Sequence, residues 1–89
     1  MESVERFKEI TQEMTNTYIA KNHDYGNSFD KSCDEFGFVA AVVRMNDKMN
    51  RLKEIARGKE LKVSESAYDT LKDLANYCIL SIMWLENQK

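Results

Sequence analysis

The chain has 89 residues, of which 43% are hydrophobic and 31% are charged, with no proline, three glycines and a formal net charge of −2. This length supports one domain, and the near-average composition excludes a disordered or collagen-like protein. The small net charge excludes a protein that binds duplex nucleic acid or an anionic membrane over its whole surface.

Scarce helix breakers favour long helices, so we expect an all-α protein, a three-helix protomer with residues 1–89 forming one domain. Cys33 and Cys78 are too few for the disulfide framework of a small secreted domain, so we expect reduced thiols that serve packing. The acidic N-terminal residues do not resemble a secretion signal, and no apolar run reaches membrane-spanning length. We therefore expect a cytoplasmic location.

The first predicted helix covers about residues 3–22, because side chains suited to a core recur at helical spacing. Its expected inner stripe consists of Val4, Phe7, Thr11, Met14 and Tyr18. The following segment, 22–30, reads NHDYGNSFD and is rich in residues that favour turns. We expect a loop there.

This predicted loop and the end of the first helix gather side chains that could contact a ligand: Lys21, Asn22, His23, Asp24, Tyr25 and Phe29. His23 suits acid–base chemistry or hydrogen bonding to a ligand, and its alternative role is that of an ordinary loop residue. Tyr25 and Phe29 are four residues apart and suit stacking on a nucleotide base. The alternative for both is to anchor the loop to the core.

The middle helix is predicted to begin at Ser32, which forms a capping-box pattern with Glu35, and to end near Gly58. Gly37 either interrupts this helix or permits a close approach. The expected core-facing stripe consists of Val39, Val42, Asn46, Met49, Leu52 or Lys53, and Ala56.

A second stripe on this helix carries charge, with Arg44, Asp47, Lys48 and Arg51 at i, i+3, i+4 and i+7. Three cations around one anion can bind phosphate groups. A solvated face of mutually paired charges is the alternative. Residues 44–62 hold seven basic and three acidic side chains, so this local excess suits a few phosphates only.

The third helix is predicted to begin after Ser64 or Ser66, with an inner stripe that consists of Ala67, Leu71, Leu74, Cys78, Ile82 and Leu85. Its C-terminal half, YCILSIMWL, is apolar on nearly every side, with Ile79, Met83 and Trp84 widening the stripe. A small protomer cannot cover such a surface. We therefore expect a homo-oligomer built on the third helix, an oligomeric helical bundle.

Asp69, Asp73 and Asn76 lie at i, i+4 and i+7 on the third helix. Carboxylates at this spacing could hold Mg²⁺ together with a substrate phosphate. They could equally form ion pairs with Lys72 or with the cations of the middle helix, which would join the two helices.

Three segments together, KNHDYGNSF, VVRMNDKMNRL and DTLKDLANYCIL, resemble the first type of nucleotide-modification-associated domain, a family found mainly in bacteriophages and bacteria. The resemblance covers about residues 21–85. It implies a small helical protein that handles a nucleotide-like ligand, because the family is linked to nucleotide metabolism.

A more distant similarity is to the MazG-type all-α nucleoside triphosphate pyrophosphohydrolases, whose metal helix carries an E-x-x-D pattern. Asp73 and Asn76 occupy that pattern here, so an asparagine stands in place of one charged ligand. The best match to the partner helix is basic. Fewer carboxylates disfavour binding of several Mg²⁺ ions.

We therefore expect a protein that binds a phosphorylated nucleotide without cleaving it, with no catalytic residue, no metal ligand and no cofactor. Arg44, Lys48 and Arg51 would hold the phosphates. Such a protein could sequester a host signalling nucleotide for a phage or serve phage nucleotide metabolism. The alternatives are a Mg²⁺-dependent nucleotide hydrolase with Asp69 and Asp73 as ligands, and a helical protein-interaction module.

Overall fold

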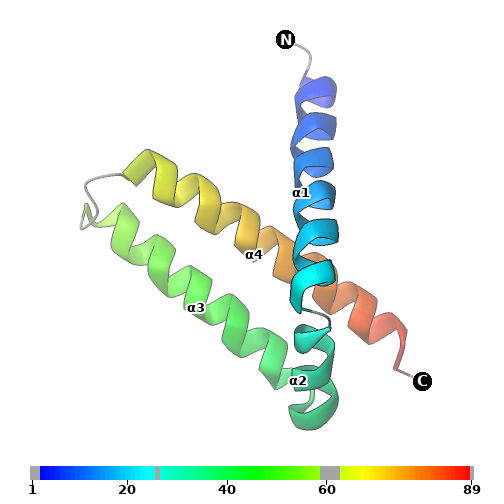
Figure 1. The fold of residues 1–89 in the computed structure, drawn as a ribbon. Helices are drawn as coiled ribbons and strands as arrows, with labels where there is room; N and C mark the ends of the chain where they lie inside the picture. Colours follow the sequence, from blue (N-terminus) through cyan, green and yellow to red (C-terminus); the bar gives the residue numbers. More distant parts are fainter. Residues whose placement is uncertain (1–2, 26, 59–62, 89) are drawn as a thin grey trace.

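The computed structural model describes residues 3–25, 27–58 and 63–88, and for residues 23–25 and 63–66 it describes the backbone alone. The elements within these ranges are α1 (Ser3–Tyr25), α2 (Ser28–Phe36), α3 (Val39–Ala56) and α4 (Val63–Glu86) (Figure 1). The predicted all-α class is confirmed. The predicted count of three is wrong for the described ranges, because the predicted middle helix is divided at Gly37 into α2 and α3.

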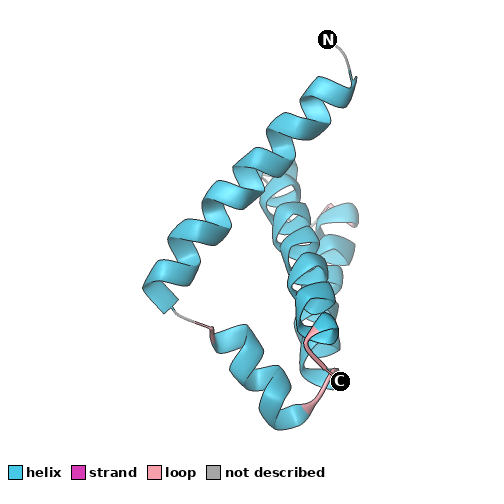
Figure 2. Ribbon diagram, turned by 90° about the vertical axis from the view of Figure 1, so that its right-hand side faces the viewer, coloured by secondary structure: helices cyan, strands magenta, loops and turns pink. Residues whose placement is uncertain are grey.

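Helices α3 and α4 form an antiparallel pair, and the short α2 packs against one end of both (Figure 1). Helix α1 crosses α4, and its N-terminal half extends beyond the other helices. Figure 2 shows α1 and α2 forming the two sides of an angle that faces the α3–α4 pair. No helix in the described part of the chain is long and apolar enough to cross a membrane.

Helix α1 covers residues 22–25 of the predicted loop, and α2 covers residues 28–30. Helix α2 begins before the predicted Ser32 because two of its side chains enter the core. Phe29 is 6% exposed and Cys33 is 1% exposed, and a spacing of four places them on one face. Burial of this face outweighs the turn preference of the neighbouring Asn and Ser residues. Ser32 therefore lies inside α2 and does not start a helix as predicted, and α4 begins at Val63, just before the two predicted capping serines.

Gly37 ends α2 with φ 84° and ψ −173°, a combination that is essentially restricted to glycine. A Cβ atom added at this residue would meet no atom within 4 Å. Of the two predicted roles, Gly37 therefore has the first, the interruption of a helix. Gly58, with φ 78°, follows the end of α3 as predicted.

The core lies where α2, α3 and α4 meet. Phe29, Cys33 and Ala41 are buried there, and the partly buried side chains around them are Ala40, Met45, Tyr77, Leu80 and Trp84. The Trp84 indole Nε1–H donates to Asp34 Oδ1 at 2.9 Å, which ties the end of α4 to α2. Helices α2, α3 and α4 thus each contribute apolar side chains to the core.

The predicted core stripe of α3 is rotated from the observed one. Val39, Val42 and Met49 are 58%, 45% and 42% exposed, whereas Ala41 and Ile55 are buried. The half-buried Arg44 and Lys48 share the inner face with them. The long aliphatic stems of such residues cover apolar surface while their charged ends bond elsewhere, so a polar residue here does not mark the outer face.

The predicted inner stripe of α4 is also displaced. Thr70 and Ser81 are buried, whereas Leu71 is 53%, Ile82 57% and Leu85 46% exposed. The Ser81 hydroxyl donates to the Tyr77 carbonyl oxygen at 2.6 Å, so the buried serine satisfies its hydrogen bond within the helix. The apolar residues chosen from the sequence therefore lie largely on the surface of the protomer.

Candidate functional site

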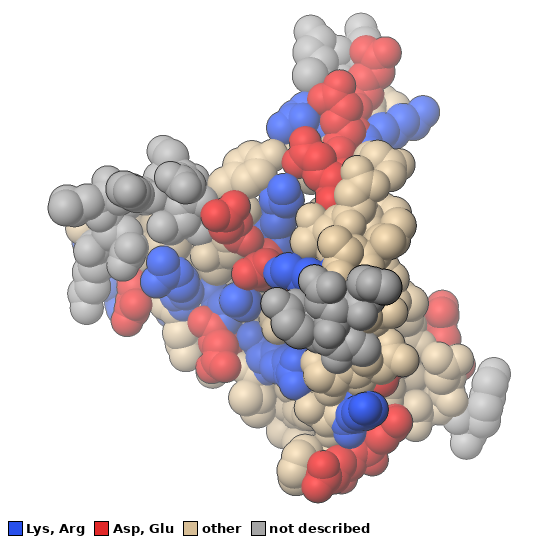
Figure 3. Space-filling view, viewed as in Figure 1, with Lys and Arg blue, Asp and Glu red and all other residues tan. Residues whose placement is uncertain are grey.

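All four helices contribute to a cleft of about 180 Å³, which we call the main cleft. Its lining consists of Tyr18, Lys21, Asn22, Asn27, Ser28, Phe29, Asp30, Arg44, Asn76, Tyr77, Leu80, Met83 and Asn87. Two cations, one carboxylate, and several amide and hydroxyl groups share this lining. In Figure 3, Lys and Arg atoms gather at the centre of the viewed face, where α1 crosses the α3–α4 pair.

Arg44 is held in the main cleft by two contacts with α2. Its Nη2 donates to Ser32 Oγ at 2.9 Å, and its guanidinium carbon lies 5.8 Å from the centre of the Phe29 ring. Phe29 also stacks with Tyr77, with 5.9 Å between ring centres. The guanidinium therefore rests on an aromatic surface in a fixed place, an arrangement that favours a cation.

This packing corrects the predicted role of Phe29. A residue that stacks on a ligand base needs an open ring face, but Phe29 is 6% exposed and contacts both Tyr77 and Arg44. Phe29 belongs to the floor of the main cleft, in agreement with the alternative that it anchors its segment to the core.

The main cleft adjoins a second pocket of about 320 Å³, which we call the side pocket. Met14, Thr17, Lys21, Asp69, Lys72, Asp73 and Asn76 line it. Lys21 and Asn76 line both cavities and therefore stand at their boundary. The volume of the side pocket reaches the lower end of the roughly 300–1,000 Å³ typical of small-molecule sites.

Asp73 links the cations of two helices at this boundary. Its Oδ2 lies 3.1 Å from Lys48 Nζ of α3, and its Oδ1 lies 3.9 Å from Lys21 Nζ of α1. The predicted pairing between the acidic face of α4 and the cations of α3 is thus confirmed for Lys48. The carboxylate also lies beside Lys21, which lines both cavities.

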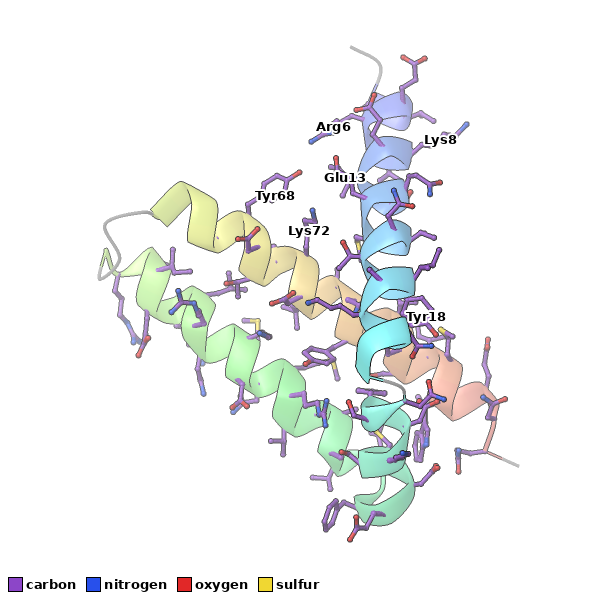
Figure 4. All side chains as sticks on the ribbon, viewed as in Figure 1. Arg6, Lys8, Glu13, Tyr18, Tyr68 and Lys72 are labelled. Atoms are coloured by element: carbon purple, nitrogen blue, oxygen red, sulfur yellow. The ribbon has the colours of Figure 1, made fainter. Side chains whose placement is uncertain are left out.

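Above the side pocket, α1 and α4 are joined by a polar network (Figure 4). Lys72 Nζ donates to Glu13 Oε1 at 3.2 Å, and Arg6 Nη2 donates to the Tyr68 hydroxyl oxygen at 3.2 Å. Arg6 Nη1 also lies 3.6 Å from Glu13 Oε2. The hydrogen bond from Lys72, together with the positive charges of Lys72 and Arg6, lowers the pKa of Glu13.

Acid is expected to weaken the contact that Glu13 makes between α1 and α4. Folding lowers the pKa of Glu13 from 4.5. The contribution of Glu13 to the free energy of unfolding is therefore complete above pH 4.5, and it is lost as the pH falls through the pKa of the folded protein. Thermal denaturation at pH values from about 7 to about 3 should show a smaller acid-induced fall in melting temperature for Glu13→Gln than for the wild type. Glu35→Gln, at an exposed position of α2, is the control. Equal pH dependence of Glu13→Gln and the wild type would contradict the expectation.

The structure brings together most of the predicted site residues for which it describes side chains. These are Lys21, Asn22, Phe29, Arg44, Asp69, Asp73 and Asn76, which line the two cavities, and Lys48, which reaches them through Asp73. Asp47 and Arg51 lie on the exposed part of α3 and line neither cavity. The side chains of His23, Asp24 and Tyr25 lie outside the described residues.

Several lining residues were missed by the sequence reasoning. Asn27 precedes α2 and Ser28 and Asp30 lie in its first turn, a segment predicted to be a loop. Lys72 was considered only as an ion-pair partner, although it neighbours Asp73. A sequence signal did exist for Tyr18, which continues the predicted inner stripe of α1.

Neither the described carboxylates nor the cysteines form a metal cluster. No three His, Cys, Asp or Glu side chains among the described residues lie close enough to hold a metal ion together. Both cysteines are free; Cys33 is buried and Cys78 is exposed. Burial raises the pKa of the Cys33 thiol, which suits a packing role.

A family model described as nucleotide modification associated domain 1 matches residues 21–85. The chain belongs to this family. The matched segment begins at Lys21 and contains every described residue of the main cleft except Tyr18 and Asn87. Comparison with curated proteins and with solved structures gave no significant match.

Proposed function

We propose that this chain binds a phosphorylated nucleotide, or a signalling molecule derived from one, without cleaving it. The observation that carries the proposal is the meeting of Lys21, Arg44 and the N-terminus of α2 at one cleft. A family with nucleotides in its description supports the same class of ligand. Residues 1–89 would act as one nucleotide-binding domain.

The main cleft suits the phosphate end of such a ligand. Arg44 and Lys21 offer charge-assisted hydrogen bonds to phosphate oxygens. Asn27 precedes α2 and makes no side-chain capping bond, so the backbone N–H groups of the first turn can donate to an anion. Asn22 and Ser28 add neutral donors at the same place.

The side pocket suits the nucleoside part of the ligand, because its lining is of mixed charge whereas cations outnumber carboxylates in the lining of the main cleft. Asp69 can accept hydrogen bonds from ribose hydroxyls or from base amino groups. The amide of Asn76 at the boundary can both donate to and accept from a base edge. A nucleotide would thus lie across Lys21 and Asn76, with its ends in the two cavities.

Charge pairing around Asp73 supports binding without metal-dependent hydrolysis. A hydrolase of the alternative type needs carboxylates free to hold Mg²⁺ beside the substrate phosphate. Asp73 is instead shared between Lys48 and Lys21. These two cations occupy the carboxylate, and their positive charges repel an added divalent cation.

Under this proposal, the protein acts inside a host cell as a homo-oligomer, and neither duplex nucleic acid nor a membrane is its partner. Sequestration of a host signalling nucleotide and service in phage nucleotide metabolism both use the same binding reaction. Exposed Leu71, Ile82 and Leu85 on α4 support self-association through that helix.

The test compares nucleotide retention with and without divalent metal. The protein is incubated with a panel of nucleoside mono-, di- and triphosphates in EDTA or in Mg²⁺, desalted and heat-denatured, and the released compounds are separated by chromatography. We expect one class of nucleotide to be recovered intact with equal yield from both samples. Side-chain cations rather than metal neutralise its phosphates.

A hydrolase would give a different pattern in the same experiment. Retention lost in EDTA, together with monophosphate or pyrophosphate in the Mg²⁺ sample, would overturn the proposal if Asp73→Ala abolished product formation. Asp47→Ala is the matched control, since Asp47 is a carboxylate that lines neither cavity. No retention of any nucleotide would favour the protein-interaction module.

A further inference from the structure

The protomer exposes more surface than a folded monomer of its mass should. Its accessible area is 6765 Å², whereas a monomer of 10.4 kDa is expected to expose about 5,400 Å². Its radius of gyration is 14.6 Å, against about 12 Å expected for 89 residues. The excess of about 1,400 Å² is larger than the roughly 800 Å² that each partner buries in a standard protein interface.

Part of this excess lies on residues 3–10 of α1, which we call the α1 arm. Val4 and Phe7 are 63% and 71% exposed. Phe7 lies two helical turns before Met14, on the same face of α1 that continues to Tyr18. Figure 1 shows that the N-terminal end of α1, which holds the arm, extends beyond the crossing of α1 with α4.

The two sides of the α1–α4 crossing differ in chemistry. One side holds the polar network of Arg6, Glu13, Tyr68 and Lys72 (Figure 4). The other side is an apolar groove of about 170 Å³, which we call the α1–α4 groove. Its lining consists of Thr11, Met14, Thr15 and Tyr18 of α1 and Asn76, Ile79, Leu80 and Met83 of α4.

We propose that the α1 arm of a second copy of this chain occupies the α1–α4 groove. One molecule carries both an arm with exposed apolar side chains and an open apolar groove, so two copies related by a two-fold axis can each insert the arm into the groove of the other. The interface would join α1 and α4 of both copies into one helical bundle. The polar side of each crossing remains satisfied within its own chain.

A second copy suits this surface because the groove is mainly apolar and the arm exposes two large apolar side chains, Val4 and Phe7. Phe7 supplies an aromatic anchor of the kind that dominates interface energetics, and Ile79 and Met83 supply an adaptable apolar receptor. Tyr18 and Met83 line both the α1–α4 groove and the main cleft. The inserted arm would therefore lie next to the main cleft, although its insertion does not depend on a nucleotide.

Light scattering on the ligand-free protein tests the proposal directly. We expect a mass of at least twice 10.4 kDa at micromolar concentration. Phe7→Glu should raise the dissociation constant roughly a hundredfold or more, because two buried rings per dimer are lost. Phe36→Glu is the matched control, since Phe36 is similarly exposed, at 65%, but lies on α2.

A monomeric wild type would overturn the proposal, and so would an assembly that Phe7→Glu leaves intact or that both variants dissociate equally. Mixed cysteine variants cover the case in which Phe7→Glu fails to fold. In a Cys78→Ser background, tagged Phe7→Cys chains are oxidised with untagged Ile79→Cys chains. A covalent heterodimer of tagged and untagged chains is the expected product, and its absence would place the arm elsewhere.

Discussion

Replacing Arg44 by alanine is expected to weaken nucleotide binding roughly ten- to a hundredfold, because a charge-assisted hydrogen bond of about 1.5–3 kcal/mol is lost. Arg44 lines the main cleft and is held there by Ser32 and by the ring of Phe29. Its guanidinium is therefore already in place when a phosphate arrives. Calorimetric titration with the nucleotide retained by the wild type measures the effect.

Arg51→Ala supplies the matched control for this prediction. Arg51 is an arginine of the same helix, about two turns further along, and it lines neither cavity. We expect its replacement to change affinity by less than about threefold, an effect typical of a remote charge. Arg44→Lys, which keeps the charge, separates loss of charge from loss of the contacts with α2. A loss for Arg44→Ala no larger than that for Arg51→Ala would contradict the placement of the phosphate at Arg44.

Phe29→Ala is expected to lower the free energy of unfolding by about 3–5 kcal/mol, the usual cost of removing a buried phenylalanine ring. A domain of this kind has a total stability of about 5–15 kcal/mol, so the variant should unfold at a much lower urea concentration. Phe29 fills the junction of α2 with α3 and α4 and supports both Tyr77 and Arg44.

Phe36→Ala removes an identical side chain from the same helix at a position that is 65% exposed. Its effect should remain within about 0.5 kcal/mol, as for most surface substitutions. Urea denaturation followed by circular dichroism compares the two variants under one condition. Similar losses from both would show that α2 is not fastened to the core through Phe29.

The helical class and the long helices could be predicted because glycine and proline are scarce and the apolar spacing is helical. The start of α2 at Ser28 could not, because its first residues favour turns and its stability comes from burying Phe29 and Cys33. The inner face of α3 was predicted wrongly for a related reason. Arg44 and Lys48 were assigned to the outer face by polarity, whereas their stems lie on the inner face and their ends find partners on α2 and α4.

The candidate site was predictable by residue type but not by position on the folded chain. Asp47 and Asp73 look equivalent in the sequence, yet only Asp73 lies where α1, α3 and α4 approach one another. Lys21 and Arg44 are far apart in sequence, and the return of the chain through α2 brings them to one cleft. Such a meeting depends on how the helices cross, which no local pattern encodes.

The position of Asp73 between Lys48 and Lys21 also affects the entropy of binding. The ion pairs of Asp73 limit the rotamers of two long side chains, of which Lys21 lines both cavities. Ordering one such side chain on binding costs about 0.5–1.5 kcal/mol. For an anionic ligand, part of that loss has therefore occurred during folding.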